Sequence, residues 1–86
     1  MPTFYHLYKM KKTTYTKQEN SLLKKIGQRI RSARQNLGLT QKTFAKACKL
    51  DSSYISVVER GECNISLLNL NKIAKALKLP LSSIIS

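Results

Sequence analysis

Acidic side chains are scarce in this chain. Its 86 residues include only 4 Asp and Glu against 16 Lys and Arg, which gives a formal net charge of +12. There is also a single histidine. The groups that usually perform general acid–base catalysis are therefore nearly missing. The chain also lacks a Ser/His/Asp set, paired acids and a Gly-rich phosphate loop, so we expect no enzymatic activity.

Cysteine is also rare, and the two that occur, Cys48 and Cys63, do not make a disulfide framework. Cys48 lies at helical spacing with apolar residues and is expected in the core, whereas Cys63 lies just past a glycine and is expected to be exposed. Two thiols and the distant His6 do not match zinc-ligand spacing, so we expect no metal and no cofactor. Free thiols and the lack of a secretory leader favour the cytoplasm.

Long apolar runs are missing as well, and no segment approaches the length of a transmembrane helix. A basic chain could instead lie on an anionic membrane, but the apolar faces of its helical segments are needed to build a core. The positive charge favours a polyanionic partner, because binding to one releases condensed counterions. No small-molecule site is evident. The length allows a single domain.

The periodic segments that are present all have helical spacing, and none alternates with the period of a strand. Helices are expected at about residues 18–36, 41–49, 52–60, 67–77 and 81–85, with Gly38 ending the first and Pro80 following the fourth. Residues 1–17 are expected to be a flexible basic tail, or alternatively an arm that reaches DNA, before a domain at 18–86. Met10 is a second candidate translation start.

Two short helices with their own start signals dominate the middle of the chain. Thr40 and Asp51 are N-cap residues, because their side-chain oxygens can accept bonds from free N–H groups of a first helical turn. Apolar residues follow each cap at helical spacing, and only a tight turn separates the two helices. Such a pair, with the second helix placed to enter a DNA groove, is a helix-turn-helix.

Residues 26–85 resemble the Cro/C1-type helix-turn-helix family of phage repressors and bacterial regulators. The resemblance rests on short motifs at matching spacing, namely residues 26–31 with Arg34, 37–41, 44–45, 54–56, 59–61 and 73–77. It implies an all-α, five-helix, lambda-repressor-like domain and a sequence-specific regulator of transcription that binds double-stranded DNA. Residues 51–67 are most similar to restriction–modification controller proteins. The chain departs from them at Ser52 and Cys63, where controllers often carry DNA-contacting arginines.

The resemblance and a helical wheel together nominate the DNA contacts. The wheel places Ile55, Val58 and Glu59 inward. The residues expected to face bases are Ser52, Ser53, Tyr54 and Val57. Those expected on the DNA backbone, or on bases, are Gln41, Lys42, Lys49, Ser56, Arg60, Asn64 and Ser66. For the lysines, the alternative is a solvated surface charge. Because serine discriminates bases poorly, we expect DNA shape to carry part of the specificity.

Glu59 is the one acid on an inward face, and a buried carboxylate needs a partner. In the family that partner comes from the first helix, and the matching residue here is Arg34. The resemblance therefore implies an Arg34–Glu59 salt bridge that ties the first helix to the recognition helix.

The family usually binds a palindromic operator as a homodimer, with recognition helices about 34 Å apart. The late apolar residues exceed what a small core can take, so some are expected to form the dimer surface. These residues are Leu67, Leu68, Leu81, Ile84 and Ile85. With few acids left to touch RNA polymerase, a repressor is favoured over an activator. The alternative is a DNA-binding antitoxin of a toxin–antitoxin pair, since antitoxins can share this fold.

Overall fold

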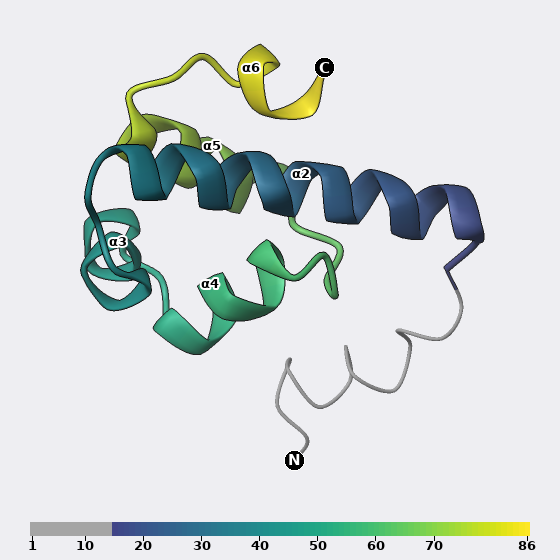
Figure 1. Cartoon of the computed structure of the whole chain (residues 1–86), viewed down its shortest axis with the longest axis horizontal. Coiled ribbons are helices and arrows are strands. Elements are labelled where there is room, and N and C mark those ends of the chain that lie inside the picture. The colour runs from purple at the N-terminus through teal and green to yellow at the C-terminus, as the bar shows by residue number, and fades with distance from the viewer. Residues whose placement is uncertain (1–14) are drawn as a thin grey trace.

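The computed structural model describes residues 15–86, and within this range every regular element is a helix. The helices are α2 (Lys17–Asn36), α3 (Gln41–Cys48), α4 (Ser52–Glu59), α5 (Leu67–Leu77) and α6 (Ser82–Ile85) (Figure 1). The expected all-α, five-helix architecture is confirmed. Of the tail or arm predicted over residues 1–17, residues 1–14 lie outside the described residues, while Thr16 caps α2 and Lys17 begins it. The prediction of no metal role for His6 and the candidate start at Met10 also lie outside the described residues.

Side-chain caps explain where the helices begin. Thr16 and Glu19 form a capping box, in which the Glu19 N–H donates to Thr16 Oγ1 at 3.1 Å and the Thr16 N–H donates to Glu19 Oε1 at 2.8 Å. This cap starts α2 at Lys17, one residue before the expected start. Thr40 caps α3 with a second capping box, whereas the Asp51 and Ser66 side chains cap α4 and α5 by accepting from the N–H groups of Ser53 and Asn69.

Helix α2 is the longest element; α4, α5 and α6 pack against it, and α3 packs against α4 and α5. In Figure 1, α3 and α4 lie along one side of α2, and α6 lies on the opposite side after α5. The core forms between them, and its largest fully buried side chains come from every helix: Phe44, Ile30, Ile55, Ile73 and Ile84. The ends of the apolar stripe of α2 project beyond this core, which leaves Leu22 and Leu37 exposed.

Ile84 was expected at the dimer surface, and the structure shows that this is wrong. Its side chain is only 1% exposed and belongs to the core. Helix α6 folds back onto α2, where Arg29 Nη1 donates to the main-chain oxygen of Ile84 at 3.1 Å. The return of the chain after Pro80 is a tertiary event that helical spacing does not encode.

The crossing of α2 and α4 depends on two glycines. A Cβ atom at Gly27 would lie 2.4 Å from the carbonyl oxygen of Val58, and one at Gly61 would lie 2.5 Å from Cα of Lys24. Gly61 also has a positive φ of 71°, which other residues adopt at a cost. The two backbones therefore touch without intervening side chains, and this contact sets the position of α4.

None of the described helices is long and apolar enough to cross a membrane.

Candidate nucleic-acid interface

The turn between α3 and α4 is built from three residues with different tasks. Lys49 ends α3 in the left-handed conformation, with φ 60° and ψ 40°. The Leu50 N–H donates to the Ala45 oxygen at 2.9 Å, and the Leu50 side chain packs against the core. Asp51 then caps α4. This arrangement fixes α4 at an angle to α3 and leaves one of its faces in solvent.

The start of α4 is held by its cap. Asp51 Oδ1 accepts from both the Ser53 N–H and the Ser53 hydroxyl, each at 2.8 Å. These bonds lower the pKa of the Asp51 carboxyl. Ser52 and Ser53 are exposed, and Ser56 is partly exposed one turn later. Small hydroxyls thus cover the tip of the helix that was expected to face base edges.

Val57 was expected to face DNA, and its placement on the exposed side of the helix is wrong. Its side chain is 8% exposed and belongs to the core cluster. The wheel considers only the helix and omits the loop that follows, which turns back at Gly61. In that loop the Glu62 N–H donates to the Val57 oxygen at 3.1 Å.

Cys63, expected at the surface, is also buried, with 4% of its area exposed. Burial raises the pKa of its thiol to about 11 and that of Cys48 to about 11. Both thiols are therefore protonated near neutral pH. The same loop partly covers Tyr54, and burial raises the pKa of its phenol. The Tyr54 hydroxyl accepts from Asn69 Nδ2 at 3.1 Å, so this side chain is anchored to α5.

Arg34 and Glu59 form the ion pair that the family resemblance implies, and both side chains are buried. Arg34 Nε donates to Glu59 Oε2 at 2.7 Å, and Arg34 Nη2 donates to Oε1 at 3.0 Å. Arg34 Nη1 also reaches the Leu39 carbonyl oxygen at 2.7 Å. Gln41 Nε2 adds a bond to Glu59 Oε1 at 3.1 Å. One network therefore joins α2, the start of α3 and the end of α4.

The residues expected on the DNA backbone lie at four places around α4. Gln41 and Lys42 begin α3, and Lys49 lies in the turn. Arg60 lies at the end of α4, where Nη1 donates to Ser56 Oγ and Nε pairs with Glu62 Oε1 at 3.2 Å. The remaining two are Asn64 and Ser66 in the loop before α5. Asn64 is exposed, whereas the Ser66 hydroxyl accepts from the Asn69 N–H at 3.1 Å as a cap.

A polar cleft of about 710 Å³ lies between α2 and α4, and sequence reasoning did not find it. Its lining residues are Lys24, Gln28, Arg31, Arg34, Gln41, Ser56, Glu59, Arg60 and Glu62. The signal that could have revealed it is the i, i+4, i+7 spacing of Lys24, Gln28 and Arg31, which places them on one edge of α2. Within residues 15–86, no three His, Cys, Asp or Glu side chains gather as a metal site would require.

Comparison with known proteins identifies the family. The helix-turn-helix family model matches residues 30–84, which is more than half of the chain. The chain belongs to the helix-turn-helix family. Its matched region contains α2 from residue 30 onward, then α3, the turn, α4, α5 and most of α6. The chain is therefore a DNA-binding regulator of the helix-turn-helix type, as its sequence indicated.

Several helix-turn-helix relatives are control proteins. Control protein C.MunI from a Mycoplasma species is 35% identical over 68 residues, which cover 78% of this chain and 92% of that protein. Control protein C.BamHI from Bacillus amyloliquefaciens is 41% identical over 59 residues, covering 67% and 73%. The crystal structure of the restriction-modification controller protein C.AhdI from Aeromonas hydrophila matches with a TM-score of 0.71 and 45% identity, covering 72% and 94%. The resemblance to controller proteins is thus confirmed.

Proposed function

We propose that this chain is a transcriptional regulator that binds a two-fold symmetric operator as a homodimer, in the manner of a restriction–modification controller or repressor. The observation that carries the proposal is the exposed polar face of α4. The buried Arg34–Glu59 ion pair joins this helix to α2, and the chain has a net charge of +12. A helix presented this way fits the major groove, and the positive charge favours the surrounding phosphates. Because bacterial DNA lies in the cytoplasm, the regulator would act there. The proposal assigns it no catalytic step.

Base readout falls to the exposed tip of α4. Ser52 and Ser53 are its first two residues, and a serine hydroxyl can donate to or accept from several bases. Val57 is left out of this set because it is buried. Tyr54 contributes the accessible part of its ring, since its hydroxyl already accepts from Asn69. Few strong base contacts remain, which supports a role for DNA shape in operator choice.

Backbone contacts would set the register of the protein on its operator. Gln41 and Lys42 occupy the first turn of α3, where free N–H groups favour an anion. Lys49, Arg60 and Asn64 extend this set around the exposed face of α4. Such contacts give affinity and salt dependence but little sequence information.

The dimer surface would use the apolar side chains that the fold leaves in solvent. Leu67 is 68% exposed and Leu68 is 76% exposed at the start of α5, and Ile85 is exposed at the end of α6. Leu81 packs partly against the core and would contribute only its outer edge. A two-fold dimer would cover such residues and separate the two recognition helices by about one DNA turn, roughly 34 Å.

Selection of bound sites from random duplex DNA, at two salt concentrations, tests this function. We expect enrichment of a two-fold symmetric site with half-sites about one turn apart. Steeply salt-dependent binding with no enriched sequence would contradict the proposal, because charge alone would then explain it. Co-purification of an untagged protein at fixed stoichiometry would instead favour the antitoxin alternative.

A further inference from the structure

The cleft between α2 and α4 has two walls of different electrostatic character. On the α4 side, each arginine already faces an acid, because Arg34 pairs with Glu59 and Arg60 pairs with Glu62. On the α2 side, Lys24 and Arg31 form no salt bridge with any acid of the chain, since all four acids lie in the described residues. Both side chains are exposed and line the cleft. The cleft therefore carries two uncompensated positive charges along one wall.

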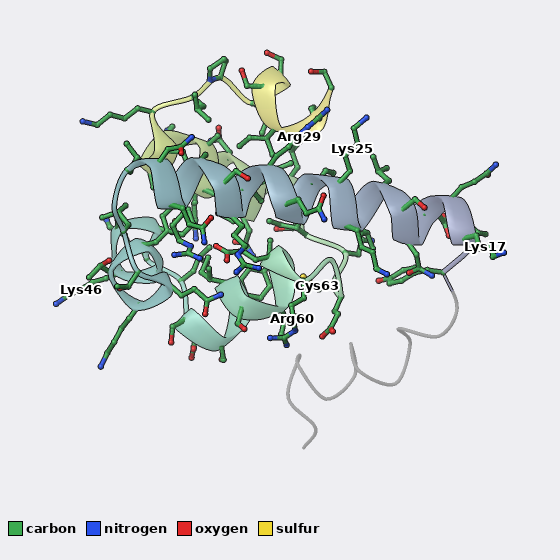
Figure 2. All side chains as sticks on the ribbon, in the orientation of Figure 1. Lys17, Lys25, Arg29, Lys46, Arg60 and Cys63 are labelled. Carbon is green, nitrogen blue, oxygen red and sulfur yellow. The ribbon has the colours of Figure 1, made fainter. Side chains whose placement is uncertain are left out.

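Neutral donors lie between these charges. Gln28 is four residues after Lys24 and three before Arg31, so the three side chains share one edge of α2. The opposite wall ends at Ser56 and Arg60, which also belong to the exposed face of α4. The cleft thus opens on the side of the molecule from which α4 meets DNA. Figure 2 shows Arg60 on this side, with Lys25 and Arg29 on the other side of α2.

From this arrangement we propose that the cleft binds a backbone phosphate of the duplex, held by Lys24 and Arg31, beside the base pairs that α4 reads. The inference rests on the proposed operator binding and deepens it. It adds a phosphate contact from α2 to the contacts proposed for α3 and α4. A cationic wall with an amide between two charges suits a tetrahedral anion that keeps part of its hydration. The contact is independent of sequence and strengthens binding to every site.

The test compares two double variants with the same change in net charge. Lys24→Gln/Arg31→Gln removes both charges of the cleft. Lys25→Gln/Lys75→Gln removes two exposed charges, one from the other side of α2 and one from α5. Glutamine keeps most of each aliphatic stem, and all four side chains are exposed, so both variants should melt at the temperature of the wild type.

Duplex binding is then measured across a range of salt concentrations with the selected operator and with an unrelated duplex. For the cleft variant we expect the slope of log Kd against log salt to fall by about 1, since one lost phosphate contact removes about 0.9. Affinity should drop about tenfold for both duplexes, leaving the preference for the operator unchanged. Arg31→Lys, which keeps the charge, should retain most of the slope. The control variant should change the slope by less than half as much.

The outcomes separate this inference from the proposed function. If the wild type selects no operator, the proposed function fails. If the wild type binds its operator and both double variants have the same slope of log Kd against log salt, only the proposed phosphate contact in the cleft is overturned. Titration with inorganic phosphate at constant ionic strength, followed by the amide NMR signals of α2, tests the other source of phosphate. Saturable phosphate binding with an unchanged DNA slope would assign the cleft to a free anion and overturn the proposal.

Discussion

The Glu59 carboxylate is shared by two side chains from different helices. It accepts two bonds from Arg34 and one from Gln41, and so connects α2, α3 and α4 through a single side chain. Because both charged partners are buried, each depends on the other to offset its lost hydration. Gln41 takes part in this network and also lies where a phosphate would bind. Operator binding through Gln41 would therefore also affect the buried hydrogen-bond network around Glu59.

Removing one partner of this pair should cost more stability than its own bonds suggest. Arg34→Met and Glu59→Gln are each expected to lower the free energy of unfolding by about 3–5 kcal/mol. Arg34→Met should be worse, because it also leaves the Leu39 carbonyl without its donor. The combined variant should lose less than the sum, since neither charge is then left alone. Urea unfolding followed by circular dichroism measures all three.

Arg60 and Glu62 provide the matched control, because they form an ion pair at the surface. Arg60→Met and Glu62→Gln are expected to change stability by less than about 1 kcal/mol each. If the Arg34 and Glu59 variants lose no more free energy of unfolding than the Arg60 and Glu62 variants, the structural role given to Glu59 would be contradicted.

The success of sequence analysis at this scale depends on whether the signal is local. The caps at Thr40 and Asp51 use atoms within three residues of the cap, so residue type and position were enough to predict them. The Arg34–Glu59 pair spans 25 residues and came from the family resemblance rather than from periodicity. Val57 and Cys63 were misplaced because their burial depends on a loop that turns back after α4.

At the scale of elements, α2 and α4 approach each other closely at Gly27. Nothing in the helical pattern of residues 17–36 predicts this contact, because glycine within a helix indicates only a weaker helix. In the structure its missing side chain lets the carbonyl groups of Val58 and Glu59 pack directly on α2. By contrast, the helix boundaries were predicted well, since caps and Gly38 mark them in the sequence.

Gly27→Ala should therefore destabilise the fold although alanine favours helices. The added Cβ would lie 2.4 Å from the Val58 oxygen and 2.7 Å from the Glu59 oxygen, and backbone atoms cannot rotate away. We expect a loss of at least about 2 kcal/mol in urea unfolding, from overpacking. We also expect weaker operator binding per folded molecule, because α4 must shift relative to α2.

Gly38→Ala separates these two effects. Gly38 has a φ of +72°, but no atom lies within 4 Å of the point that an added Cβ would occupy, so alanine there costs only backbone strain of about 1–2 kcal/mol. Its operator affinity per folded molecule should match that of the wild type. Equal binding defects in the two variants would argue against the α2–α4 contact as the feature that positions α4.

At the scale of the whole molecule, the exposed leucines at the start of α5 are expected to form part of the contact between two copies of the chain. Leu68→Glu should weaken the proposed dimer by at least tenfold, because it places a charge in the proposed apolar contact. Thermal melting at low protein concentration should be unchanged, since Leu68 is 76% exposed in the single chain. Sedimentation over a range of concentrations measures the association directly.

Leu22→Glu is the control for this change. Leu22 is also exposed, but it lies near the start of α2 rather than on α5 or α6. The self-association constant of the Leu22→Glu variant should equal that of the wild type. If it disrupts dimers as strongly as Leu68→Glu, the dimer surface has been placed on the wrong helices.

Whole-molecule features were the least predictable from the sequence. The fold class followed from helical spacing and from the family resemblance. Helical spacing did not show which apolar residues complete the core. Ile84 was assigned to the dimer surface because the late apolar residues exceed what a small core can take, and α6 is too short for periodicity to show which of them faces inward. The cleft between α2 and α4 was not predicted either, since it depends on how these two helices pack in the folded molecule.

The exposed serines at the tip of α4 have a consequence for how such a regulator can diversify. Ser52 and Ser53 are exposed and take no part in the core cluster. Exchanging Ser52 for a larger side chain would therefore alter operator preference with little penalty in folding, whereas the glycine contact and the buried ion pair would stay fixed. In a lineage of duplicated copies, new specificities could arise by single substitutions at that tip, each inherited on an unaltered scaffold.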